Sequence, residues 1–329
     1  MAATKTIINH SLSSSSHIMR MDNSKSNRMT KFINNIKQNP ILYLMALPVI
    51  VYYILFHYFP MYGIVMAFQN FIPTKGFLES PWVGLKHFSS FFRDIYFWRL
   101  LRNTFLLSFY DLIYGFPVPI IFALLLNEIT NKKFKKLTQT ITYLPHFISL
   151  VVICGLIVTF TNTSGVITYI FSTVTGKEPS NMLANVHYFR SLYIGSNIWQ
   201  GFGWGSIIYF AALSAIDVTL YEAASIDGAS RFMQAIKITI PSILPTIVIM
   251  LILRIGQLMS VGWEKLILLY NPLTYEVADV ISTYVYRKGL IEFNYSYSAA
   301  VGLFNSVINF TLILMANYIS RRINETSLW

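Results

Sequence analysis

The chain has 329 residues, of which 54% are hydrophobic and only 12% are charged, so it carries more apolar side chains than one water-soluble core of this length can bury. Its net charge of +11 would suit nucleic acid, but Lys and Arg stand between long apolar blocks, which favours membrane-flanking loops and no nucleic-acid partner. The single cysteine, Cys154, excludes an internal disulfide and lies in an apolar run, where we expect it to pack.

Residues 1–40 are polar and rich in Ser, Asn and Lys, which predicts a largely disordered N-terminal tail. Six apolar segments follow, each long enough to cross the ~30 Å hydrocarbon core of a bilayer as a helix. The sequence predicts an all-α integral membrane protein with a transmembrane domain over residues 41–323, a C-terminal tail at 324–329, and spans at 41–59, 104–126, 140–160, 192–216, 242–261 and 299–319. Prolines and glycines in or beside the first five spans predict kinked helices around a pathway.

The distribution of Lys and Arg predicts the orientation of these spans. Six spans place both termini on one side, and the short segment 127–139 concentrates four lysines between two spans. Because Lys and Arg accumulate in cytoplasmic loops, we expect this segment and both termini to face the cytoplasm. The longer segments 69–103 and 263–298 then lie outside, and their aromatic and turn residues predict ordered external elements.

The segment 217–241, between the fourth and fifth spans, carries the most specific pattern. Glu222 would lie near the start of a short helix, at the positive end of its dipole, and Gly228 suits a left-handed residue that ends it. We therefore expect a helix, a turn and a second helix. Small side chains allow close approach by another protein and an aromatic side chain offers it an apolar anchor, and these residues are Ala223, Ala224, Ala229 and Phe232. An ordinary amphipathic connection between two spans is the alternative.

The full spacing in this segment is Glu222-Ala-Ala, three residues, Gly228, nine residues and Ile-Thr-Ile-Pro241. It resembles the cytoplasmic EAA loop of permease subunits of bacterial binding-protein-dependent ABC importers, whose usual Ile-x-Leu-Pro ending differs here only at Ile240. The resemblance extends from Ile41 to the carboxyl end and implies the type I importer permease fold. It implies that this loop couples the chain to a partner ATPase through Glu222, Ala223, Ala224, Asp227, Gly228, Ala229, Phe232 and Pro241.

Two further stretches are similar to the carbohydrate branch of that family. Residues 80–88 contain Trp-Val-Gly-Leu-x-x-Phe, and residues 254–287 resemble importers of polysaccharides and oligosaccharides, including uronates. The resemblance implies an oligosaccharide cargo, a second homologous permease subunit, two ATPase subunits, an external solute-binding protein and the bacterial cytoplasmic membrane. A uronate-containing cargo is a hypothesis, which five basic residues in 69–103 against Glu79 and Asp94 also favour.

Nucleotide and metal chemistry is not expected in this chain. No Gly-x4-Gly-Lys-Ser/Thr loop occurs, and the only Gly-Lys pair, Gly176-Lys177, is followed by Glu178. We therefore expect a transport subunit without catalytic residues or cofactors, with ATP and Mg on the partner ATPases. The six histidines are scattered without metal-ligand spacing.

Polar side chains within the predicted spans are candidates for the substrate path, because they are costly in a bilayer. They are Asn197, Trp199, Gln200, Arg254, Gln257, Asn305 and Asn309. The charge of Arg254 needs a partner within the membrane. Asp111 is expected in the outer half of the second span, so we expect no acidic residue of this chain to pair with Arg254. The candidates are a cargo carboxylate, a helix-end carbonyl or the other permease. Gly201 and Gly205, four residues apart, predict a close helix contact.

Two other classes of membrane protein remain open. An ion- or proton-coupled secondary transporter would also be polytopic, but it normally needs intramembrane carboxylates or an internal repeat, and Asp111 stands alone here. Composition alone also allows a non-conducting scaffold subunit. The coupling-loop pattern argues against both.

Overall fold

The computed structural model describes residues 34–324 and divides into two units, Met1–Gly63 and Ile64–Trp329. Most of the predicted N-terminal tail, residues 1–33, and residues 325–329 of the C-terminal tail lie outside the described residues. Residues 34–38, at the end of the predicted N-terminal tail, are helical. No β-strand occurs within residues 34–324, which contain only two isolated β-bridges.

The described part of the first unit consists mainly of one long apolar helix. It consists of α2 (Pro40–Tyr53), the π-helical turn η1 (Ile54–Tyr58) and the start of the 3-10 segment η2 (Phe59–Phe68). No residue of α2 or η1 is buried, although most are apolar around the whole helix. A helix that is hydrophobic all round needs an apolar surrounding rather than water. The predicted first span, 41–59, falls within the membrane-crossing candidate Pro40–Phe68.

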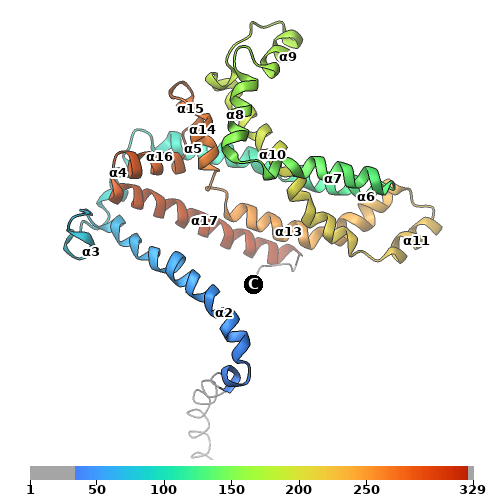
Figure 1. The fold of residues 1–329 in the computed structure, drawn as a ribbon, viewed down its shortest axis with the longest axis horizontal. Coiled ribbons are helices and arrows are strands. Elements are labelled where there is room, and N and C mark those ends of the chain that lie inside the picture. The colour runs from blue at the N-terminus through green and yellow to red at the C-terminus, as the bar shows by residue number, and fades with distance from the viewer. Residues whose placement is uncertain (1–33, 325–329) are drawn as a thin grey trace, which may run out of the picture. The chain divides into compact units, whose positions relative to one another are not determined.

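The second unit contains a bundle of long helices (Figure 1). Helices α6 and α7 pack on α10, and α13 packs on α10 and α17. Among the described residues, five helical stretches are long and apolar enough to cross a membrane, or six if α10 and α11, bent by 70°, form one span. The long helices are α5 (Phe97–Tyr110), α6 (Pro117–Glu128), α7 (Lys132–Phe147), α8 (Leu150–Thr161), α9 (Val166–Thr175), α10 (Val186–Ser214), α13 (Ile240–Gly256) and α17 (Tyr295–Asn324).

Three of these stretches contain a π-helical turn just before a proline, and in the first of them η1 precedes Pro60. The turn η3 (Asp111–Gly115) joins α5 to α6, which begins at Pro117, and η5 (Ala235–Thr239) leads into α13 with Pro241 in its first turn. Proline cannot donate to the carbonyl four residues earlier, and its ring presses on that carbonyl. A wider turn accommodates both effects without ending the helix. Pro117 and Pro241, two of the prolines predicted to kink the spans, therefore lie beside local changes of helix type, whereas Pro48 and Pro245 lie inside α-helices.

The prediction of one helix over residues 140–160 is wrong. Helix α7 ends at Phe147, Ile148 is extended, and the Ser149 side chain accepts a hydrogen bond from the backbone N–H of Val152 to begin α8. Pro145 lies in the last turn of α7, and Ser149 offers a cap for a new helix, so the chain breaks here. A hydropathy window passes over the break because both sides are apolar. The other predicted spans lie within helices, except that α10 ends at Ser214, two residues before the predicted limit of 216, and α13 ends at Gly256, five residues before the predicted limit of 261.

Short elements gather at one end of the bundle and the connections between long helices at the other. Figure 1 shows α4 and α16 at one end, and the α6–α7 connection with α11 at the opposite end. The segments 69–103 and 263–298 are ordered, as expected. Their short elements are α3 (Gly76–Glu79), α4 (Lys86–Phe92), α14 (Trp263–Leu269), η6 (Pro272–Thr274), α15 (Tyr275–Ala278), α16 (Ile281–Tyr286) and η7 (Arg287–Ile291).

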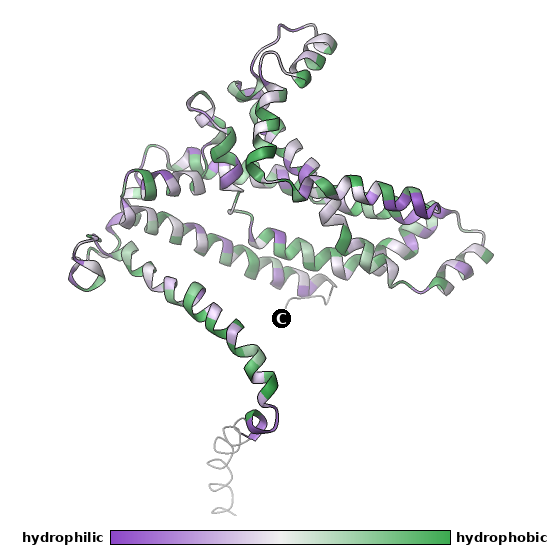
Figure 2. Cartoon of the chain, viewed as in Figure 1, coloured by the Kyte–Doolittle hydropathy of each residue, from purple (hydrophilic) through white to green (hydrophobic). Residues whose placement is uncertain are grey.

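Apolar residues form small cores and also much of the outer surface. Figure 2 shows hydrophobic residues along the flanks of α13 and hydrophilic ones gathered where α6 meets α7. The core that positions the site joins α5, α8, α10 and α14, and it contains Leu107, Cys154, Tyr193 and Leu266. Cys154 is 2% exposed in this core, which confirms its predicted packing role. Exposed apolar flanks on long helices are what a bilayer requires.

Candidate functional site

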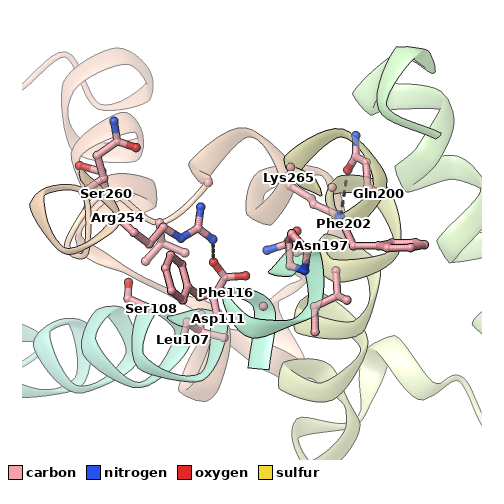
Figure 3. A pocket seen from close by; sticks show the side chains of 18 of the residues that line it. Leu107, Ser108, Asp111, Phe116, Asn197, Gln200, Phe202, Arg254, Ser260 and Lys265 are labelled. Atoms are coloured by element: carbon pink, nitrogen blue, oxygen red, sulfur yellow. Dashed lines mark hydrogen bonds and ion pairs between the residues drawn. The ribbon is translucent and has the colours of Figure 1, made fainter. Parts of the chain in front are cut away.

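A polar cavity lies between the long helices of the second unit (Figure 3). Its volume is about 740 Å³, within the range of small-molecule sites, and its walls come from α5, η3, α6, α10, α13 and α14. The charged and amide side chains that line it include Asp111, Asn197, Gln200, Arg254, Gln257 and Lys265. Four of the seven predicted substrate-path residues, Asn197, Gln200, Arg254 and Gln257, are therefore brought together.

Arg254 does have an acidic partner in this chain, so that part of the prediction is wrong. The Arg254 guanidinium donates to the Asp111 carboxylate, which the turn η3 presents from the facing helix. Asp111 is the first residue of η3, and Arg254 lies in the last turn of α13, which ends at Gly256. Gly115 also matters, because a Cβ there would stand 3.3 Å from Asp111 Oδ1. The pair balances both charges, and 47% of the Arg254 side chain remains exposed.

Lys265 is a cavity residue that sequence reasoning missed. It lies in α14, only 4% of its surface is exposed, and its Nζ donates to Gln200 Oε1 at 3.3 Å. Burial lowers the pKa of Lys265 to about 8. A sequence signal existed, since Trp263-Glu-Lys-Leu-Ile-Leu-Leu269 places a charged pair in an apolar run directly after the fifth span. Only the packing of α14 on α8 and α16 reveals that Lys265 is buried.

The other three predicted path residues lie elsewhere. Trp199 is 45% exposed and is not part of the cavity wall. Asn305 lines a second hollow of about 500 Å³ beside Trp263 and Tyr286. Asn309 holds the segment after α13, because its amide donates to Ser260 Oγ at 2.8 Å and accepts from the Met259 backbone N–H at 2.8 Å. Asn305 and Asn309 are four residues apart but therefore belong to two different sites.

Some glycines of α10 allow close packing against neighbouring helices, whereas another leaves open space in the cavity wall. Gly203 makes the tightest contact, since a Cβ there would stand 2.1 Å from the backbone oxygen of Thr142 in α7. Gly205 lies against Pro119 of α6, where a Cβ would meet ring carbon at 3.3 Å. Gly201 lines the cavity and has no atom within 4 Å of its Cβ position. The predicted close contact is therefore made by Gly203 and Gly205, not by Gly201.

The segment 217–241 forms the predicted helix, turn and helix, as α11 (Val218–Ile226) and α12 (Arg231–Gln234). Gly228 has φ +75°, as expected for a left-handed residue that ends a helix. The N–H of Ala229 bonds to the Ala224 carbonyl at 2.9 Å and that of Gly228 to the Ser225 carbonyl at 3.1 Å, which is a Schellman motif. The turn is thus held by backbone geometry that glycine alone adopts without strain.

The expected position of Glu222 at the start of a helix is wrong. Asp217 caps α11 by accepting from the Thr219 N–H at 2.9 Å, so Glu222 lies in the fifth position of the helix. The backbone and side-chain hydrogen bonds from Thr219 lower the pKa of Asp217 and keep the cap ionised. The helix starts earlier than predicted because Asp217, rather than a residue nearer Glu222, supplies the capping oxygen.

Most of the segment 217–241 named for coupling is exposed, but hydrogen bonds hold its two helices together. Glu222, Ala223, Asp227, Gly228, Phe232 and Pro241 are exposed, whereas Ala224 and Ala229 are half-buried. The Gln234 amide donates to Ser225 Oγ at 3.0 Å and to the Ala229 carbonyl at 3.1 Å, clamping α12 to α11. Arg231 pairs with Glu128 at the end of α6 at 3.1 Å. The loop therefore presents a fixed surface, with the Phe232 side chain 75% exposed at its tip.

A second charged network stands at the opposite end of the bundle. Asp279 is fully buried and accepts from both terminal nitrogens of Arg287, at 3.2 and 2.7 Å, and from the Thr283 hydroxyl at 2.8 Å. Burial opposes the charge of Arg287, but the hydrogen bonds and charge of Asp279 outweigh it and raise the pKa of Arg287. Arg99 lies 3.6 Å from the same carboxylate. This network fixes α16 against α5.

No metal site is indicated within residues 34–324, because no three His, Cys, Asp or Glu side chains converge there. His146 stacks on Trp204 with ring centres 4.6 Å apart, and His87 contacts the Gln69 carbonyl at 3.1 Å. Both histidines therefore have packing or hydrogen-bonding surroundings.

Comparison with known proteins gives the family. Residues 101–325 match the family described as binding-protein-dependent transport system inner membrane component. Protein LplB of Bacillus subtilis (strain 168) is 42% identical over 295 residues, covering 89% of this chain and 92% of that protein. The polygalacturonan/rhamnogalacturonan transport system permease protein YteP of the same strain is 43% identical over 305 residues, covering 93% and 95%.

A solved structure agrees with these relatives. The crystal structure of a bacterial ABC transporter involved in the import of the acidic polysaccharide alginate superposes with a TM-score of 0.82 at 44% identity, covering 89% of this chain and 99% of that one. The matched region includes both the cavity and the loop 217–241. The chain therefore belongs to the family of inner membrane components of binding-protein-dependent transport systems.

Proposed function

We propose that this chain is the permease subunit of an ATP-driven importer that moves oligosaccharides, including uronate-containing chains, across the bacterial cytoplasmic membrane. Two of the similar proteins are named for acidic polysaccharides, polygalacturonan/rhamnogalacturonan and alginate. A cavity of about 740 Å³ lined by amides and charged groups suits a sugar, whose hydroxyls need many hydrogen-bonding partners.

The observation that carries this proposal is the link between loop and cavity. A single helical stretch, Arg231–Gly256, runs for 26 residues from the loop to Arg254 in the cavity wall. At 1.5 Å per residue this stretch is about 39 Å long. A movement of the loop is therefore passed along one continuous element to the charged cavity, as alternating access requires.

The partners follow from that mechanism. We assign ATP and Mg to two ATPase subunits, one of which contacts the loop 217–241 through the exposed Phe232, and we assign delivery of cargo to an external binding protein. A second homologous permease completes the pathway. In this arrangement the chain has no catalytic residues, and both of its termini face the cytoplasm.

A proton- or ion-coupled transporter is less well supported. Such a transporter needs an intramembrane carboxylate that is free to take up the ion. Asp111, the acidic residue of the cavity wall that belongs to a membrane-crossing helix, is engaged by Arg254. The five basic residues of 69–103 also favour an acidic cargo, but not all of their charge is free. Arg99 lies 3.6 Å from Asp279, so this one positive charge is partly balanced.

The test is transport by the reconstituted complex of both permeases and both ATPases, with the cognate binding protein. Oligogalacturonate and its methyl ester of equal length serve as acidic and neutral probes. We expect ATP-dependent uptake, with the acidic probe preferred. Uptake driven by an ion gradient without ATP would contradict the importer assignment, whereas preference for the ester would contradict only the acidic cargo.

A further inference from the structure

The two cations of the cavity differ in how their charge is balanced. Figure 3 shows Arg254 joined to Asp111 on one side of the cavity, and Lys265 joined to Gln200 on the other. Arg254 therefore has a carboxylate, but Lys265 has a neutral amide at 3.3 Å. The five ion pairs found among the described residues do not include Lys265.

Glu264 does not supply the missing charge. It is the neighbour of Lys265 in α14, and adjacent residues on a helix point in different directions. Glu264 is exposed, whereas Lys265 is 4% exposed. Glu264 also lines the cavity, but it makes no ion pair with Lys265. The other titratable groups around the cavity and the adjoining core are Tyr110, Asp111, His146, Cys154, Tyr193, Tyr209, Arg254 and Tyr270. Asp111 is engaged by Arg254, so neither carboxylate of the cavity wall is paired with Lys265.

A buried ammonium without a carboxylate is unusual, because desolvation of the charge is compensated only by pairing or by a ligand. The Lys265 Nζ has three N–H donors, of which Gln200 takes one. Burial lowers its pKa to about 8, so the group remains mostly protonated at neutral pH. The cavity thus offers a cation with unused donors beside an amide.

We propose that Lys265, held by Gln200, binds a carboxylate of the cargo inside the cavity, while Arg254 serves to hold Asp111. This inference rests on the proposed function and names the residue that recognises a uronate. The charge of Arg254 is already balanced by Asp111, and the negative charge of Asp111 would repel an incoming carboxylate at that place. When Lys265 binds a carboxylate, it loses at most its hydrogen bond to the neutral Gln200 Oε1.

The test uses Lys265→Gln, Lys265→Arg and the double variant Asp111→Asn/Arg254→Gln in the reconstituted complex. Lys265→Gln should reduce oligogalacturonate uptake about tenfold relative to methyl-ester uptake, the typical effect of one lost charge-assisted hydrogen bond. Lys265→Arg keeps the positive charge and should keep the preference for oligogalacturonate over the methyl ester. The double variant removes the ion pair of Asp111 and Arg254 and should also keep that preference.

A pH profile gives a readout that a merely structural role would not change. In the unaltered complex, oligogalacturonate uptake should fall as pH rises through about 8, because Lys265 loses its proton there while the cargo carboxylates stay ionised. In Lys265→Arg this fall should disappear. Lys177→Gln, at an exposed position after α9, is the matched control and should retain the fall.

The outcomes separate this inference from the proposed function. If the unaltered complex imports neither probe, the proposed function fails. If it imports oligogalacturonate and Lys265→Gln does so equally well with the same pH profile, only the role of Lys265 is wrong. Loss of acidic preference in the double variant alone would assign the carboxylate to Arg254 instead. Should Lys265→Gln fail to assemble, the pH profile of Lys265→Arg decides.

Discussion

Replacing Gly228 by valine tests whether the loop 217–241 couples this chain to an ATPase. Gly228 has φ +75° and no atom within 4 Å of its Cβ position, so a side chain there meets no neighbour and the cost is backbone strain alone. An L-residue in the left-handed region costs about 1–2 kcal/mol, and valine is at the upper end because it is branched at Cβ. The hydrogen bonds of Ala229 and Gly228 that close the turn then become less populated.

A strain of about 1–2 kcal/mol lowers the population of the closed turn by roughly 5–30-fold. We therefore expect Gly228→Val to insert and assemble normally, but to lose cargo-stimulated ATPase activity and uptake by up to that factor. Gly228→Asn should lose less, since asparagine tolerates this conformation. The assays are stimulated ATPase activity and uptake in proteoliposomes.

Gly176 supplies a matched control, because it ends α9 with φ +69° and likewise has nothing within 4 Å. Gly176→Val introduces the same backbone strain away from the loop, and coupling should survive. Full stimulation and a normal import rate in Gly228→Val would refute the assignment of the loop. An equal loss in Gly176→Val would instead point to general destabilisation.

Two further predictions concern the helices around the cavity. Gly203→Ala places a methyl group against the Thr142 carbonyl and should destabilise the protein by roughly 1–3 kcal/mol, whereas Gly201→Ala, with open space, should leave the midpoint of thermal unfolding unchanged. Equal midpoints would contradict the close contact of α7 and α10. Asp111→Asn leaves Arg254 without its carboxylate and should cost roughly 1–3 kcal/mol, which Arg254→Gln in the same chain should restore. Failure of that rescue would show that the two side chains do not act as a pair.

The apolar spans and the loop could be predicted from the sequence because their signals are local. Membrane helices need long apolar segments whatever their neighbours are, since no water is present to satisfy the backbone. The turn at Gly228 depends on φ, which is set within a few residues, so its left-handed conformation was predictable. The capping of α11 was missed because Asp217 and Glu222 are both acidic, and hydrogen-bond geometry alone distinguishes them.

The pairings in the cavity were decided by the tertiary structure. Asp111 and Arg254 are 143 residues apart in sequence, and Asp111 lies in the π-helical turn η3. Such a turn shifts the helical register in a way that hydropathy does not record. Lys265 looks like a surface lysine in sequence and becomes a buried one only when α14 packs on α8 and α16. Charge balance in a membrane cavity depends on distances between helices, and these arise only when the helices pack together.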